Sequence, residues 1–202
     1  DPRAACTNCH SDAEEALAAS VHHKADPASA KRPDCLSCHG ALHAMAPVAD
    51  EASLVHPKRL AATCGKCHAD PELGAQAGVK LVQPLAAYEA SVHAGGVARG
   101  EHAATCSDCH GSHGILPAEN AQSQVNRKNV PATCAACHAE VSKAYGESVH
   151  GVAAAAGIGE SPVCTDCHGD HHVQTAEAWR LPTSTTVCAD CHTDAGLALT
   201  DP

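Results

Sequence analysis

The chain has 202 residues, a formal net charge of −10 and 44% hydrophobic residues, but it contains no Phe, one Trp, one Met and two Tyr. Large apolar side chains supply most of the burial energy of an ordinary domain, so this composition excludes a conventional apolar core. An acidic chain lacks the basic surface that binds phosphate, so we expect no nucleic acid as a partner. No apolar run approaches the roughly 18–20 residues of a membrane span, so we expect no transmembrane segment.

Seven C-x-x-C-H runs account for all fourteen cysteines. A zinc half-site or a redox dithiol would not require a histidine at the next position each time. The run is the attachment signature of haem c, in which the adjacent histidine binds the iron. We therefore expect seven haem c groups that replace the missing core. The signatures are Cys6/Cys9/His10, Cys35/Cys38/His39, Cys64/Cys67/His68, Cys106/Cys109/His110, Cys134/Cys137/His138, Cys164/Cys167/His168 and Cys188/Cys191/His192.

The signatures fall into an internal repeat. Each unit reads S-V-H, a Gly/Ala/Pro-rich stretch, a C-x-x-C-H-G followed closely by another histidine, and a second C-x-x-C-H. We call the C-x-x-C-H-G runs at 35–39, 106–110 and 164–168 first-type sites, and those at 6–10, 64–68, 134–138 and 188–192 second-type sites. We expect one heptahaem domain over 1–202, with a half-repeat at 1–18 and repeats at 19–88, 89–146 and 147–202.

In chain order, helices are expected after second-type sites, over 11–23 and 139–156, where good helix formers follow an acidic first turn. Proline-bearing loops are expected at 25–34 and 125–134. The sequence thus predicts mostly coil with short α-helices, negligible β structure and a chain organised by a linear array of haems.

Ten histidines lie outside the signatures, and only Met45 could compete with them for the second axial position of an iron. His22, His93 and His150 follow Ser-Val, and we expect each to bind the far face of the preceding haem. His43, His113 and His171 stand three or four residues after a signature histidine, on the same side of its own haem. We therefore expect these three to bind a neighbouring haem instead.

The seventh distal ligand is open. His56 echoes the S-V-H context and is our choice, with His102 as the runner-up, while His23 and His172 look like spare neighbours. No histidine follows His192, so the ligand of the last haem comes from upstream or from another chain.

With these doubled C-x-x-C-H motifs the chain resembles multihaem c-type cytochromes, which include periplasmic carriers, outer-membrane conduit subunits and extracellular filaments of metal-respiring bacteria. The resemblance implies bis-histidine low-spin haems in a close-packed chain, with alternating stacked and perpendicular contacts. It also implies haem attachment outside the cytoplasm, so we expect an exported, periplasmic or extracellular protein whose signal peptide has been removed.

The sequence leaves two classes of function open. One is electron transfer, as a carrier between redox partner proteins such as other cytochromes, or as a filament subunit joined to copies of itself end to end. The alternative is a multihaem reductase of nitrite, hydroxylamine or a sulfur oxyanion, which needs one open iron and acid, base or cationic groups around it. No C-x-x-C-K variant occurs, and Lys and Arg total only 13. A zinc-binding interaction module is a third reading, and a red purified protein would end it.

Overall fold

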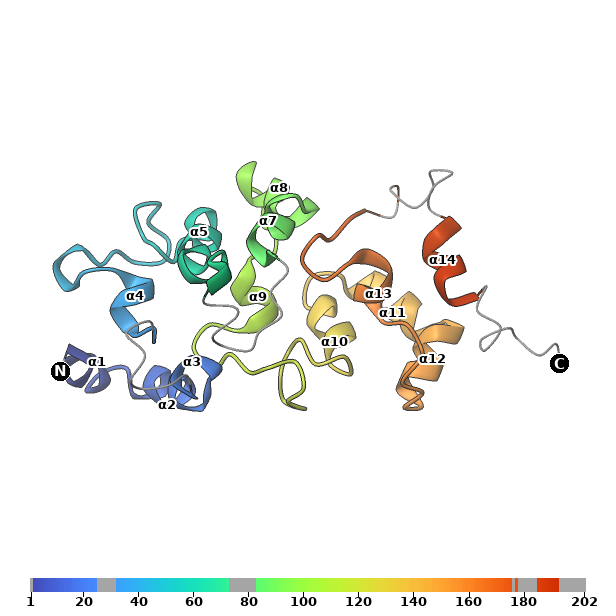
Figure 1. The fold of residues 1–202 in the computed structure, drawn as a ribbon, viewed down its shortest axis with the longest axis horizontal. Coiled ribbons are helices and arrows are strands. Elements are labelled where there is room, and N and C mark those ends of the chain that lie inside the picture. The colour runs from blue at the N-terminus through green and yellow to red at the C-terminus, as the bar shows by residue number, and fades with distance from the viewer. Residues whose placement is uncertain (1, 25–31, 73–82, 176, 178–184, 193–202) are drawn as a thin grey trace.

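The structure is a computed structural model that describes residues 2–24, 32–72, 83–175, 177 and 185–192 (Figure 1). Within these ranges all regular structure is helical and no strand occurs, which confirms the predicted short α-helices and negligible β structure. The longest helix among the described residues has 12 residues. The helices are α1 (Pro2–Thr7), α2 (Ser11–Ala19), α3 (Val21–Lys24), α4 (Cys35–His39), the 3₁₀ turn η1 (Leu42–Ala44), α5 (Pro57–His68), α7 (Pro84–Glu89), α8 (Val92–Ala98), α9 (Cys106–His110), α10 (Val130–Ala135), α11 (Ala139–Glu147), α12 (Val149–Ala155), α13 (Cys164–His168) and α14 (Thr185–His192).

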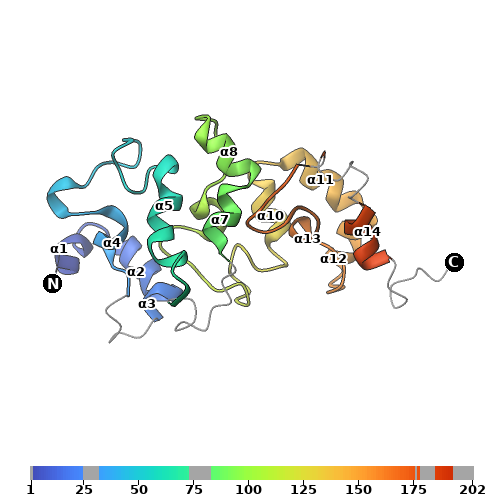
Figure 2. The ribbon, with the colours of Figure 1, turned by 45° about the horizontal axis from the view of Figure 1, so that its top comes forward.

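The molecule is elongated, and the repeats follow one another along its long axis. Helix α1 lies at one end and α14 at the other, with α5, α9 and α10 between them (Figure 1). The same order holds in the view turned by 45° (Figure 2). No helix in the part of the chain that the structure describes is long and apolar enough to cross a membrane.

The interior contains almost no apolar core, as the composition predicts. Among the described residues the buried large hydrophobic side chains are Val97, Val130 and Val163. Seven hydroxyl side chains are buried beside them, and no buried polar side-chain atom in the described ranges lacks a hydrogen-bond partner. Local polar contacts therefore stabilise the individual turns, and the described part of the chain buries too few apolar side chains to form a core that joins the repeats.

The helices predicted over 11–23 and 139–156 exist, but each is broken by the serine of its S-V-H motif. Ser20 separates α2 from α3 and Ser148 separates α11 from α12, both with extended backbone (ψ 163° and 164°). Each serine hydroxyl accepts from the backbone N–H three residues later, His23 N at 3.3 Å and Gly151 N at 3.1 Å. Serine favours this N-cap role over a helix interior, so the chain starts a new helix at the valine that comes directly after it.

The first-type sites end in a different way. Each occupies a five-residue helix, α4, α9 or α13, followed directly by Gly40, Gly111 or Gly169. These glycines have φ of 88°, 80° and 81° with extended ψ, a combination that is essentially restricted to glycine. The G of C-x-x-C-H-G is therefore a sharp turn that carries the chain away from the site immediately after the signature histidine.

Candidate functional site

The fourteen cysteines lie at or near the surface of the protein. Each is half-buried or exposed, and none forms a disulfide. Cysteine is among the residue types most often fully buried, so fourteen thiols that all stay at least partly accessible are unusual. In the part of the chain that the structure describes, no three His, Cys, Asp or Glu side chains converge as a structural zinc site requires.

Histidine rings face one another in five pairs within the described residues. Each pair joins one signature histidine to one histidine outside the signatures. The centre-to-centre distances are 6.1 Å for His22–His68, 6.1 Å for His39–His113, 6.2 Å for His93–His138, 5.9 Å for His110–His171 and 6.1 Å for His150–His192.

This spacing fits two imidazoles on opposite faces of one iron. A metal–imidazole bond is about 2 Å long and each nitrogen lies roughly 1 Å from its ring centre, so the two centres of such a pair lie roughly 6 Å apart. The interplanar angle varies from 14° to 51° while the separation stays between 5.9 and 6.2 Å. A fixed separation with variable rotation is expected of axial ligands, so these residues fit haem iron.

The S-V-H histidines pair with second-type sites, but not with those that the sequence analysis predicted. His22 faces His68 rather than His10, His93 faces His138 rather than His68, and His150 faces His192 rather than His138. The prediction of the preceding haem was wrong because it assumed a chain that folds back on itself. Each of these histidines instead pairs forward with the second-type site of its own repeat, and the partner of His192 lies upstream.

The histidines that come after the first-type sites pair backward. His113 faces His39 and His171 faces His110, each one repeat earlier. They leave their own sites, as predicted, because the glycine turn separates them from the preceding signature histidine. His43 stands at the same position in the first repeat, and it is exposed and forms no ring pair with any described residue.

His56, the predicted seventh ligand, caps α5 in the structure. Its Nδ1 accepts from Lys58 N at 3.2 Å. Asn126 stands at the matching position of the next repeat, where its Oδ1 accepts from Lys128 N at 3.1 Å. A residue at this position thus has a turn-forming role in both repeats, and ligation by His56 stays a prediction.

The other candidate ligands lie apart from the five pairs. His23 Nδ1 contacts the Arg32 guanidinium at 2.5 Å. His102 and His172 are exposed and form no ring pair among the described residues.

Two signature histidines remain outside these pairs of rings and are placed in other ways. His10 lines an open cavity of about 390 Å³ together with Cys9 and His113. His168 Nδ1 lies 2.9 Å from the carbonyl of Gln174, to which it donates. A hydrogen bond from Nδ1–H to a carbonyl fixes the ring and leaves Nε2 as the metal-binding nitrogen.

Consecutive sites approach one another through their cysteines in chain order. The first cysteines meet where a second-type site precedes a first-type site. Cys64 forms a hydrogen bond with Cys106 and Cys134 with Cys164, and this contact together with burial raises the pKa of Cys64 and Cys134. The same arrangement occurs between the first two sites of the chain, where burial and, to a smaller extent, the neighbouring Cys6 raise the pKa of Cys35.

The second cysteines meet at the alternate junctions. Burial raises the pKa of Cys38, Cys109 and Cys167, and a cysteine of the following site adds to the effect: Cys67, Cys137, and Cys188 with Cys191, respectively. The seven sites therefore lie in a row in the same order as in the sequence. Contacts between first cysteines and contacts between second cysteines alternate along this row.

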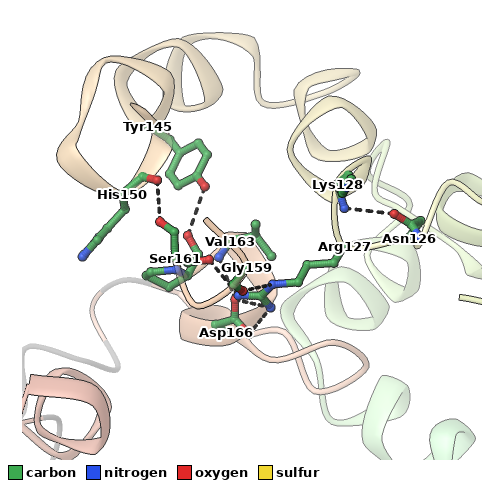
Figure 3. Close-up of polar contacts among 10 residues, drawn as sticks. Asn126, Arg127, Lys128, Tyr145, His150, Gly159, Ser161, Val163 and Asp166 are labelled. Carbon is green, nitrogen blue, oxygen red and sulfur yellow. Dashed lines mark hydrogen bonds and ion pairs between the residues drawn. The ribbon is translucent and has the colours of Figure 1, made fainter. Parts of the chain in front are cut away.

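Arg127 ties the His168 site to the preceding repeat (Figure 3). Its guanidinium donates to the Asp166 carboxylate at 2.8 Å, to Ser161 O at 2.7 Å and to Gly159 O at 3.2 Å. Asp166 in turn accepts from Val163 N at 2.6 Å at the start of α13. Burial opposes ionisation of Asp166, but these hydrogen bonds and the charge of Arg127 outweigh it and lower the pKa of the carboxyl.

Residues 98–193 match the family model of cytochrome c3. The match contains four of the seven signatures, from Cys106 to His192, in the second and third repeats. No curated protein and no solved structure matches the chain. Cytochrome c3 is a family of multihaem electron carriers, typically periplasmic, that bind haem c. The matched segment therefore indicates multihaem electron transfer.

Proposed function

We propose that the chain binds seven haem c groups, each with two axial histidines, and transfers electrons between redox partners. The observation that carries the proposal is the common spacing of 5.9–6.2 Å in the five histidine pairs. Haem c supplies one-electron redox chemistry at its iron when bound.

The proposed binding residues divide by role. The fourteen signature cysteines attach the porphyrins and the seven signature histidines supply one imidazole to each iron. His22, His93, His113, His150 and His171 supply a second imidazole, supported by their ring pairs, and His43 and His56 complete the set. Histidine on both faces without methionine keeps the reduction potentials low, and it leaves no coordination position for a substrate.

The single-file order of the sites supports a path for electrons from one end of the molecule to the other. Because signatures occur from Cys6 to Cys191, each end of the elongated chain can meet a partner. The proposed partners are other cytochromes or copies of this chain, and the proposed location is periplasmic or extracellular. A carrier and a filament subunit share this path and differ only in whether copies join.

The test is the haem content and spin state of the purified protein. Intact mass should give seven covalently attached haems per chain, and electron paramagnetic resonance of the oxidised protein should give low-spin ferric signals. A colourless or zinc-loaded protein contradicts the proposal. A high-spin signal that shifts on addition of nitrite, hydroxylamine or a sulfur oxyanion favours the reductase alternative.

A further inference from the structure

The backbone N–H of the valine in S-V-H has no acceptor in its own helix. Because the serine is the N-cap, the valine is the first residue of the helix, and N–H groups of the first turn have no intrahelical partner. The Ser91 hydroxyl accepts from Ala94 N at 3.2 Å rather than from Val92 N. In the third repeat the Ser148 hydroxyl likewise accepts from Gly151 N at 3.1 Å. The valine N–H can therefore donate to another part of the chain.

In the first and second repeats this N–H donates to a carbonyl of the following repeat. The Val21 N–H donates to Ile115 O at 2.9 Å, and the Val92 N–H donates to Val173 O at 3.0 Å. In Figure 1 the chain that follows α13 accordingly reaches the start of α8. The two hydrogen bonds connect the same positions of the repeat, so one contact between repeats occurs twice.

Each accepting carbonyl stands two residues after a histidine that pairs backward. His113 faces His39 at 6.1 Å and His171 faces His110 at 5.9 Å. The ring planes of these two pairs are nearly parallel, at 20° and 14°, whereas the three pairs of S-V-H histidines have angles of 36° to 51°. The same ring orientation therefore recurs together with the same hydrogen bond.

We propose that the S-V-H valine is a positioning residue for an axial histidine of the following repeat. Its N–H holds the segment that carries His113 or His171, and so keeps that imidazole in place at the His39 or His110 site. The histidine of the same motif binds a different haem, so each motif serves two haems, one through its backbone and one through its imidazole. This inference rests on the proposed function, since the positioned imidazoles are its axial ligands.

The hydrogen bond connects the ligands of two consecutive sites in the row. His93, directly after Val92, faces His138, while His171 faces His110. One backbone contact thus fixes the distal imidazoles of the fourth and fifth sites relative to each other. Reactions between two groups are sensitive to their separation and orientation, which such a contact keeps constant.

Proline at the valine position removes the N–H and preserves the helix. Proline is common at the first helical position, and the extended backbone of Ser91 and Ser148 (ψ 162° and 164°) suits the residue before a proline. The probe is cyanide, titrated into the oxidised, haem-loaded full chain, because an added ligand binds in proportion to the fraction of time that the axial position is open. His171→Ala opens the His110 site fully and identifies its cyanide spectrum.

Val92→Pro should keep all haems attached and raise the apparent cyanide affinity of the His110 site by about two- to tenfold, which corresponds to the loss of one hydrogen bond. Val149→Pro is the matched control, because Val149 is 80% exposed and its N–H donates to no carbonyl among the described residues. Val92→Ala keeps the N–H and removes the side chain. Both controls should bind cyanide like wild type. Wild-type affinity in Val92→Pro, or equal gains in Val92→Ala and Val92→Pro, overturn the proposal.

Two further variants keep the test decisive. In Val92→Pro/His171→Ala the proline should add nothing to the effect of His171→Ala, and a second iron with increased affinity would place the effect on His93 and overturn the proposal. Val21→Pro repeats the test at the His39 site, where the same gain is expected. Haem content separates the two proposals: seven low-spin haems with unchanged cyanide binding overturn the positioning role alone, and a chain without haem overturns both.

Discussion

The two kinds of signature differ in the residues that come after the signature histidine. After the first-type sites a glycine at positive φ turns the chain at once, and the next histidine pairs one repeat backward, as His113 does with His39. After the second-type sites at His10 and His138 the chain continues as α2 or α11 and breaks at a serine. The histidine beyond the break pairs forward, as His22 does with His68.

The difference shows how a chain with almost no apolar core can still specify its tertiary order. In the second and third repeats one histidine pairs backward with the preceding repeat. In all three repeats the S-V-H histidine pairs forward with the second-type site of its own repeat, so histidine pairs form both between and within repeats. A glycine at positive φ comes before His113 and His171, which pair backward, and a helix that ends at a serine comes before His22 and His150, which pair forward. Removing either kind of histidine pair at one site should therefore have a defined local effect.

The largest effect is expected from removing a whole site. Cys106→Ala/Cys109→Ala should leave six haems on the chain and lower the free energy of unfolding by about 3–5 kcal/mol, comparable to the loss of a large buried aromatic side chain. The reason is that the porphyrin replaces the core around α9 and accepts ligands from two repeats. Intact mass and thermal unfolding measure the two quantities. Seven haems with unchanged stability would refute the view that haem replaces the core.

The next largest effect tests whether His93 pairs with the later site at His138 or with the earlier site at His68. His93→Ala should keep all haems attached but leave one iron high-spin, because His138 loses its facing imidazole. In the Cys134→Ala/Cys137→Ala background, which lacks that haem, the same substitution should add no high-spin signal. Electron paramagnetic resonance compares the variants, with His102→Ala as the unchanged control. A new high-spin signal in that background would place His93 on the His68 site instead.

A smaller effect is expected at the glycine turn. Gly111→Ala places a side chain at φ 80° and ψ 174°, which costs about 1–3 kcal/mol, and it should displace His113 so that the iron at His39 becomes partly high-spin. Gly100→Ala is the matched control, because Gly100 has a similar φ (79°), an added Cβ meets no atom within 4 Å at either glycine, and Gly100 does not follow a signature histidine. The control should lose stability without any spectral change. Equal spectra for the two variants would show that the turn does not direct His113.

The smallest effect is expected at Arg127, whose hydrogen bonds connect the His168 site to the preceding repeat. Arg127→Ala should lower the free energy of unfolding by about 1–2 kcal/mol, since it removes hydrogen bonds between two repeats from a side chain that solvent partly screens. Arg99→Ala removes an exposed pair with Glu101 inside one loop and should leave stability unchanged. Chemical denaturation of both variants gives the comparison, and equal losses would mean that Arg127 contributes no more than a surface ion pair.

Several features of the fold could be predicted from the sequence. The absence of Phe and the abundance of Ala predict an interior without an apolar core, and only three large apolar side chains are buried among the described residues. The helix formers at 11–23 and 139–156 predict helices, because propensity acts within a few residues. The break at Ser20 and Ser148 was missed, although serine at an N-cap was the available signal.

The amino-acid sequence by itself determined which residues can carry the chemistry. C-x-x-C-H is a local pattern, so its cysteines and histidine are set by adjacent positions, as is the glycine that must come directly after a first-type site to adopt positive φ. Only the tertiary structure decided which histidines face each other. His22 and His68, or His39 and His113, are dozens of residues apart, and their pairing depends on the summed directions of the intervening turns and helices, which no local pattern contains.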